Sequence, residues 1–152
     1  MLTAYADTGT VWLGWAIFDG ASLHSCGLSR ATSKTLPGRA QEHRENLEKV
    51  GWMACDRRVA EIMVYRGRNH VGSPQIQMDQ NWIAGHIASA GFTTQGWKGN
   101  QDKNAHLQNV VLSALRESEK LMFRRVRPAG QAHNALSAIG MGLFDVGRIN
   151  RR

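Results

Sequence analysis

The sequence predicts an α/β domain in which helices pack against a mixed sheet of five strands. The first 30 residues contain three short apolar runs separated by turn signals, and the later segments alternate between helical and strand-like patterns. The chain has 152 residues, 42% of them hydrophobic and only three of them proline, which suits one globular core. No repeat or low-complexity linker marks a boundary, so we expect a single domain over residues 1–152.

Residues 2–7, 11–18 and 22–29 are the three strands predicted at the start of the chain. The segment "DTGT" separates the first strand from the second, and "DGA" separates the second from the third. An Asp-Gly pair between two apolar runs is a strong signal for a β-hairpin. We therefore expect these strands to form an antiparallel meander.

Helical and strand-like segments alternate over residues 37–99. Apolar residues at helical spacing predict an amphipathic helix over 37–54, and strand character returns over 57–67. Residues 73–91 begin with a Ser-Pro pair and end at Gly91, which is typical of a second helix with its C-terminal glycine. Residues 92–99 then indicate a short strand and a turn.

Two further helices complete the predicted order. Residues 100–123 have apolar residues at helical spacing and are expected to form the third helix, which the arginine-rich segment "RRVRPAG" ends. The last helix, from about residue 131 to 148, repeats apolar residues at intervals of three and four. Its predicted core face consists of Ala132, Ala135, Leu136, Ile139, Leu143 and Val146.

The net charge of +7 is concentrated near one end of the chain. Residues 116–152 hold eight basic and three acidic side chains, which accounts for +5 of the +7. A basic surface of this kind suits nucleic acid, because phosphates neutralised by Lys and Arg release their counterions. Solubility alone is the alternative explanation for this charge.

The cysteine pattern and the hydropathy indicate a cytoplasmic protein. Cys26 and Cys55 lie in unrelated segments and form no CxxC pair, so neither a disulfide framework nor a zinc site is predicted. We find no secretory signal pattern and no run of about 18 apolar residues. We therefore expect a reducing compartment and no membrane partner.

Two carboxylates, Asp7 and Glu61, lie in strand-like segments rather than on a helix surface. Burying an unpaired carboxylate is unfavourable, so each requires a partner. If their strands are neighbours, the two side chains form an acidic pocket of hard oxygen ligands, which suits Mg²⁺ and phosphoryl transfer. Alternatively, Glu61 faces solvent from an edge strand and Asp7 only closes a turn.

Four segments, "DTGTVWLGWAIFDG", "VAEIMVYRG", "GWKGNQDKNAHLQNVV" and "AHNALSAIGMGLF", occur in an order that resembles the RuvC family of Holliday junction resolvases, especially its phage-type members. The resemblance spans nearly the whole chain. It implies a ribonuclease H-like fold, a homodimer, and an endonuclease that uses Mg²⁺, for which Mn²⁺ substitutes. It also implies branched DNA as the partner and, for a phage-encoded protein, the cytoplasm of the bacterial host.

The same resemblance assigns catalytic positions to Asp7, Glu61, Asn134 and Ser137, with Asp7, Glu61 and Ser137 as the metal ligands. The family pattern has an acid on the first strand, another on the fourth, and Asp-x-x-Asp or His-x-x-Asp near the start of the final helix. Asn134 and Ser137 depart from that pattern, which leaves two formal negative charges in the cluster. His133 adjoins these positions and would assist as a neutral ligand or proton carrier. Alternatively, Ser137 is only a small residue at a helix contact.

Basic and aromatic residues in three segments are the candidates for contact with DNA. Arginines would meet phosphates and an aromatic ring would stack on an opened base, although a tyrosine at a strand end is equally typical of a core and single lysines are typical of a solvated surface. The candidates are Tyr65, Arg66, Arg68, Lys98, Lys103, Arg124 and Arg125.

Three functional hypotheses follow. The first is a structure-selective endonuclease that resolves four-way junctions by paired cuts, each subunit of a dimer cutting one strand, with the helix around Trp82 and Ile83 at the twofold axis. The second is a catalytically weak or inert protein of the same fold that binds junctions without cutting them, consistent with Ser137. The third is a nucleotide-binding ATPase, because "DTGT" also resembles the phosphate loop of the actin and sugar kinase class, but those proteins need two such domains.

Overall fold

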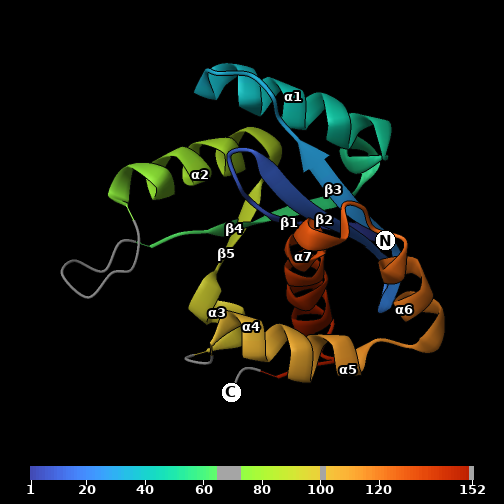
Figure 1. Cartoon of the computed structure of the whole chain (residues 1–152). Helices are drawn as coiled ribbons and strands as arrows, with labels where there is room; N and C mark the ends of the chain where they lie inside the picture. Colours follow the sequence, from blue (N-terminus) through green and yellow to red (C-terminus); the bar gives the residue numbers. More distant parts are fainter. Residues whose placement is uncertain (65–72, 100–101, 151–152) are drawn as a thin grey trace.

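A five-stranded sheet forms the centre of the molecule, with strand order β3-β2-β1-β4-β5 and helices on both faces (Figure 1). The computed structural model describes residues 1–64, 73–99 and 102–150. The strands are β1 (Leu2–Asp7), β2 (Trp12–Asp19), β3 (Ser22–Arg30), β4 (Arg57–Ile62) and β5 (Ala90–Thr93). The first three pair antiparallel, whereas β4 runs parallel to both β1 and β5. The predicted meander and mixed sheet are therefore confirmed.

Two helices, α1 (Leu36–Lys49) and α2 (Pro74–Ile87), cover one face of the sheet. The opposite face is covered by the remaining helical segments, of which α7 lies directly against β1 and β2. In chain order these are α3 (Thr94–Lys98), α4 (Lys103–His106), a π-helical turn (Leu107–Val111), α5 (Leu112–Ala114), α6 (Glu117–Arg124) and α7 (Ala132–Asp145). Short 3-10 turns occur at Trp52–Ala54 and Ala129–Gln131.

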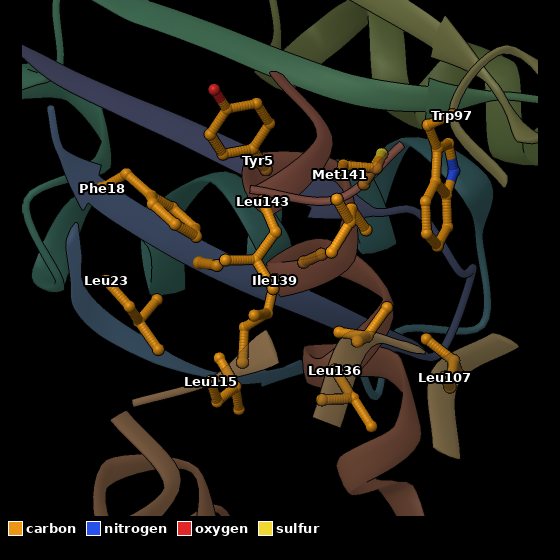
Figure 2. Packing of buried hydrophobic residues seen from close by; sticks show 14 of the residues in the cluster. Tyr5, Phe18, Leu23, Trp97, Leu107, Leu115, Leu136, Ile139, Met141 and Leu143 are labelled. Carbon is orange, nitrogen blue, oxygen red and sulfur yellow. The ribbon is translucent and has the colours of Figure 1, made fainter. Parts of the chain in front are cut away.

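The sheet separates two hydrophobic cores. Because successive strand side chains point to opposite faces, Tyr5 lies in the α7-side core while Ala4 and Ala6 lie in the core under α1 and α2. Figure 2 shows the α7-side core, where Tyr5 and Phe18 of the sheet meet aliphatic side chains of α7. Each face of the sheet is thus buried, which explains why the strands are apolar along most of their length.

Helix α7 is buried around most of its circumference. All nine residues from 135 to 143 are buried, so the helix is a central element and not a surface helix with one apolar stripe. Two glycines allow this close packing: a Cβ at Gly142 would lie 2.2 Å from the Phe18 ring, and a Cβ at Gly140 would lie 2.7 Å from the Trp97 ring. The predicted apolar face of this helix is therefore only part of its buried surface.

Three predicted helices end earlier than their patterns indicated, the last of them at Asp145 and not near residue 148. The helix predicted over 37–54 ends at Lys49, because Gly51 adopts a φ of 86° and starts a separate 3-10 turn. The helix predicted over 73–91 ends at Ile87, and Gly91 belongs to β5. A Cβ at Gly91 would lie 1.8 Å from the Ile62 side chain, so close strand packing, and not a helix cap, requires this glycine.

The third predicted helix, over 100–123, is wrong as a single element. The chain is extended at Leu115 and Arg116, which separates α5 from α6. Leu115 is buried in the α7-side core, so its burial competes with helix continuation. The turn predicted within 92–99 is instead the short helix α3, and the strand predicted over 57–67 ends at Ile62, with residues 65–67 outside the description.

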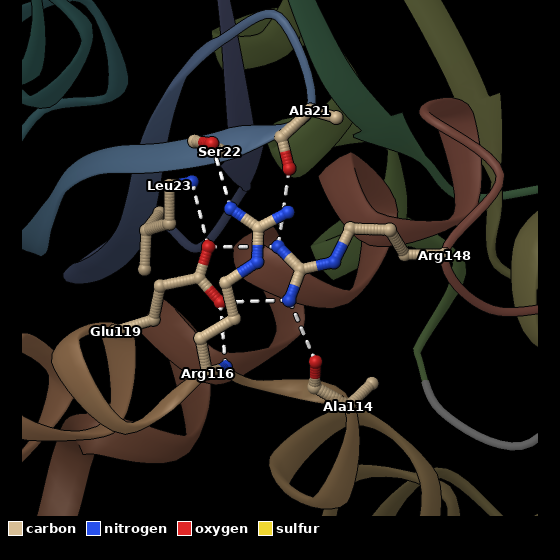
Figure 3. Close-up of polar contacts among 7 residues, drawn as sticks. All are labelled: Ala21, Ser22, Leu23, Ala114, Arg116, Glu119 and Arg148. Carbon is tan, nitrogen blue, oxygen red and sulfur yellow. Dashed lines mark hydrogen bonds and ion pairs between the residues drawn. The ribbon is translucent and has the colours of Figure 1, made fainter.

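The break before α6 is stabilised by a partly buried ion pair between Glu119 and Arg148 (Figure 3). The Arg148 Nη1 and Nη2 atoms donate to Glu119 Oε1 and Oε2 at 2.7 and 2.8 Å, and Arg148 also donates to the carbonyl oxygens of Ala21 and Ala114. The backbone N–H groups of Leu23 and Arg116 donate to the same carboxylate. This network joins β3, α6 and the chain that follows α7.

The carboxyl group of Glu119 is held in its charged form by these donors. Burial by itself raises its pKa, but the hydrogen bonds from Arg148, Arg116 and Leu23 outweigh burial and lower the pKa from 4.5 to about 2. A carboxyl whose folded pKa is lowered stabilises the fold above the unfolded pKa and loses that contribution as the pH falls toward the folded pKa. The contribution of Glu119 is therefore present at neutral pH and is lost between pH 4.5 and about 2.

We predict that Glu119→Gln lowers the free energy of unfolding at pH 7 by about 3 kcal/mol, because it removes the counter-ion of the partly buried Arg148 cation. Urea denaturation measures this, and the difference from the wild type should shrink as the pH falls below 4.5. Glu117→Gln on the same helix is the control, since Glu117 pairs with Lys120 at the surface and should leave the midpoint near the wild-type value. If the two substitutions lowered the free energy of unfolding equally, the stabilising role of the Glu119–Arg148 ion pair would be contradicted.

Candidate active site at the β1 and β4 strand ends

Asp7 and Glu61 occupy neighbouring positions on two adjacent strands. The parallel pairing of β1 with β4 places Ala6 beside Ala60, so the next residue on each strand brings the two carboxylates into register. Asp7 is 5% exposed and Glu61 is fully buried. Strand β4 lies between β1 and β5, so the alternative in which Glu61 faces solvent from an edge strand does not hold.

Both carboxylates are on the face of the sheet that α7 covers. Tyr5 and Val59 precede them by two residues and lie in the α7-side core, and residues two apart on a strand share a face. Two acids are thus placed at one edge of an otherwise apolar core. Such a placement needs compensating donors or cations, because desolvation disfavours a buried carboxylate.

Trp97 and Thr8 hold the strand end that carries Glu61. The Trp97 indole Nε1 donates to Glu61 Oε1 at 3.2 Å, and the Thr8 hydroxyl donates to the Glu61 backbone oxygen at 2.9 Å. Both residues are buried, and they come from α3 and from the turn after β1. The orientation of Glu61 therefore depends on groups from two other segments of the chain.

His106 and Lys98 are two further ionisable residues near Trp97. The fully buried His106 ring packs edge-on against the Trp97 ring, with centroids 5.3 Å apart. Lys98, which follows Trp97 directly, is 9% exposed. Lys98 was expected to face DNA from the surface, but the structure buries it beside the residue that binds Glu61.

The sequence analysis missed His106 as a component of this site. His106 belongs to no HxxxH or HExxH motif, so its sequence context does not mark it as a site residue. Its structural signal is the π-helical turn at Leu107–Val111, which begins directly after it. π-helical turns are rare in proteins as a whole, and those that occur are often at functional sites. No residue pattern predicts them.

The start of α7 is brought against the strand that pairs with Asp7. Gly14 is the register partner of Asp7, and a Cβ at Gly14 would lie 2.0 Å from the backbone carbonyl of Asn134. One helical turn after Asn134 comes Ser137, and one turn further Gly140 contacts Trp97. Ser137 therefore lies on α7 between Asn134, which packs against the register partner of Asp7, and Gly140, which packs against Trp97, the residue that donates to Glu61.

Ser137 is fully buried, and its Oγ atom has no hydrogen-bond partner within the described residues. Leaving a buried hydroxyl unsatisfied costs about 1–3 kcal/mol. If Ser137 served only as a small residue at a helix contact, alanine would make the same contact without this cost. Asn134 is half-buried, and its Nδ2 donates to Gln131 Oε1 at 3.0 Å, which keeps its amide at the start of the helix.

The donor set of this site is two carboxylates and one hydroxyl. These are hard oxygen groups of the kind that Mg²⁺ prefers, and the hydroxyl of Ser137 has no hydrogen-bond partner among the described residues. Over residues 1–64, 73–99 and 102–150, no cluster of three or more His, Cys, Asp or Glu side chains could hold a metal ion. The residues therefore fit a hard divalent cation in chemistry, but with less negative charge than a three-acid site.

The predicted DNA-contact residues fall into three groups. Arg124 and Arg125 are exposed at the end of α6, and Arg124 lines a cavity of about 290 Å³ together with Arg127 and His133. Lys103 begins α4, and its side chain is outside the description. Tyr65, Arg66 and Arg68 also lie outside the described residues.

Comparison with known proteins identifies the fold. No family model matches the chain, and no curated protein matches it in sequence. Two solved structures of Thermus thermophilus RuvC are similar: the complex with a Holliday junction substrate has a TM-score of 0.53, and a second RuvC structure has a TM-score of 0.50. Each is 14% identical, and each match covers 97% of both chains.

At this identity the similarity shows the fold. The chain has a ribonuclease H-like, mixed five-stranded sheet flanked by helices, as predicted. In the part of the chain that the structure describes, every helix is too short or too polar to span a bilayer.

Proposed function

We propose that this protein is a metal-dependent endonuclease that cuts four-way DNA junctions, with its catalytic centre at Asp7 and Glu61. The observation that carries the proposal is the pair of buried carboxylates in register at the ends of β1 and β4. Their neighbours along α7, Asn134 and Ser137, complete the candidate centre. The overall likeness to Thermus thermophilus RuvC in complex with a Holliday junction substrate supports DNA of this shape as the substrate.

The residues of the centre have separate roles in this proposal. Asp7, Glu61 and the Ser137 hydroxyl would hold Mg²⁺, or Mn²⁺ in its place. A divalent cation bound there would polarise the scissile phosphate and lower the pKa of a bound water. Trp97 orients Glu61 through its indole N–H, and Thr8 ties the turn after β1 to the same strand.

The basic end of α6 is the proposed surface for the DNA backbone. Arg124 and Arg125 are exposed there, and Arg127 follows them closely. Arg127 Nη1 donates to the backbone oxygens of Arg124 and Val126, which ties its guanidinium to the loop that precedes α7. Arg124, Arg127 and the start of α7 line one cavity, so phosphate contacts here would place DNA beside the helix that carries Ser137.

A gel-shift comparison of a four-way junction with a linear duplex of equal length tests the proposed substrate. We expect tighter binding of the junction at every salt concentration. Because phosphate contacts dominate, affinity should fall on the order of a hundredfold between about 50 and 200 mM salt. Equal affinity for the two DNAs would show that charge alone governs binding and would overturn the proposal.

A second candidate function is junction binding without cleavage. It is favoured by Ser137, because a neutral hydroxyl contributes little to the affinity for Mg²⁺ compared with a carboxylate. The described residues then offer two anionic ligands where hydrolysis through two cations requires more. Cleavage measured with Mg²⁺ and with Mn²⁺ separates the two candidates, since both predict binding.

We predict that Ser137→Asp raises junction cleavage by roughly tenfold or more, because it adds an anionic ligand where the buried hydroxyl has no partner. Ser137→Asn is the matched control, since asparagine has nearly the same shape as aspartate but carries no charge. Cleavage is measured in Mg²⁺ and in Mn²⁺, and folding is checked by circular dichroism.

Asp7→Asn in the Ser137→Asp background should abolish the gained cleavage and leave junction binding intact or tighter, because it removes a negative charge near the phosphate. If Ser137→Asp folds and binds junctions but cuts no faster than Ser137→Asn, the proposed centre on α7 is wrong.

Helix α2 is the proposed contact between two copies of the chain. Ile83, expected at that contact, is instead fully buried within its own chain, in the core under α1 and α2. Trp82 and Met78, one turn apart, remain 40% and 65% exposed and form an apolar face on α2. A twofold dimer through this face would match the twofold symmetry of a four-way junction.

We predict that light scattering gives a mass near twice the 16.9 kDa of one chain at micromolar concentration. Trp82→Glu should shift the mass to that of a monomer, because it places a charge in the apolar contact. Leu121→Glu, at an exposed apolar residue of α6, should leave the dimer intact. A monomeric wild type would remove the dimer from the proposal.

A further inference from the structure

We infer that His43, on α1, is a positioning residue for the turn at residues 8–11, which connects the Asp7 strand end to β2. This inference rests on the proposed function, because it concerns the same catalytic centre. His43 itself does not reach that centre; it acts through the backbone of the turn.

The His43 ring is fully buried and is bonded at both of its nitrogens. Its Nε2 lies 3.2 Å from the backbone oxygen of Thr10, and its Nδ1 lies 2.7 Å from Ser29 Oγ. A carbonyl oxygen only accepts, so Nε2 carries the proton and Nδ1 accepts from the Ser29 hydroxyl. Asn46 Nδ2 donates to the same Ser29 Oγ at 3.1 Å, which completes the network.

The turn that His43 binds is anchored on two sides. Thr8 donates its hydroxyl to the backbone oxygen of Glu61, and Thr10 accepts from His43. Between them, Gly9 makes a tight turn, since a Cβ there would lie 2.0 Å from the Trp12 oxygen. The anchor at Thr8 is one residue from Asp7 and is bonded to Glu61 itself, so movement at Thr10 would be transmitted to both carboxylates.

The ring is neutral in this environment. Burial lowers the pKa of His43, and the backbone oxygen of Thr10 and the carboxylate of Glu42 oppose that shift only in part. A neutral histidine ring has one N–H donor, which matches the backbone carbonyl of Thr10, and one acceptor nitrogen, which matches the hydroxyl of Ser29. Packing alone requires no such match, since a leucine would fill the space without binding the turn.

Two substitutions at this position separate the two hydrogen bonds. If asparagine replaces His43, its side-chain amide lies near the position of the ring Nδ1. If glutamine replaces His43, its longer side chain places the amide near the position of the ring Nε2. His43→Asn therefore retains a partner for Ser29 and loses the bond to Thr10, whereas His43→Gln retains the bond to Thr10. Both variants remove the buried ring, so their losses of stability should be similar.

The test compares junction cleavage, junction affinity and amide hydrogen exchange in the two variants. We expect His43→Asn to reduce the cleavage rate constant by roughly tenfold or more with little change in affinity, because it displaces the catalytic groups. The cleavage rate constant of His43→Gln should stay within about threefold of the wild-type value, because this variant retains the hydrogen bond to Thr10. Exchange at residues 8–11 should accelerate in His43→Asn and not in His43→Gln.

The outcomes distinguish this inference from the proposed function. If both variants lose cleavage in proportion to their loss of stability, and exchange at residues 8–11 rises equally in both, His43 is a packing residue and the inference is overturned. If the wild type cuts no junction, the proposed function fails. Hydrogen exchange still decides whether His43 holds the turn, because that measurement needs no substrate.

Discussion

The parallel pairing of β1 with β4 is the constraint on which the rest of this structure depends. It places Asp7 and Glu61 side by side on a face of the sheet that is otherwise apolar. Two buried acids in register are unfavourable unless donors or cations compensate them, and the surrounding segments are arranged accordingly. Trp97 donates to Glu61, Thr8 ties the next turn to the same strand, and Gly14 lets the start of α7 approach.

Two buried polar clusters on the α7 side of the sheet show opposite physical designs. In the Glu119–Arg148 network each carboxylate oxygen accepts from two donors. The cluster therefore joins three segments, and the hydrogen-bonding capacity of the carboxylate is used. At the proposed catalytic centre, by contrast, Ser137 buries a hydroxyl with no partner in the described part of the chain. Satisfied networks specify a fold, whereas an unsatisfied buried group needs a separate explanation, which the proposed function supplies for Ser137.

Local patterns identified the elements better than they identified where the elements end. The three N-terminal strands agree with prediction because their Asp-Gly and Asp-Thr-Gly turns are local features. Helix ends were wrong where a glycine had a tertiary role: Gly91 looks like a helix cap, but it is in β5 because Ile62 leaves no room for a side chain. The break at Leu115 follows likewise from burial against α7, which no window of sequence contains.

The sequence by itself determined the fold class and the two strand carboxylates, because strand alternation, turn chemistry and a charge within an apolar run are all read over a few residues. Only the tertiary structure decided that Asp7 and Glu61 are neighbours, since β4 is separated from β1 by two strands and a helix along the chain. It also decided that Ile83 is core, that Lys98 and His106 are buried beside Trp97, and that His43 binds the turn after Asp7. Burial and long-range hydrogen bonds depend on how distant segments pack, and that information is distributed over the whole chain.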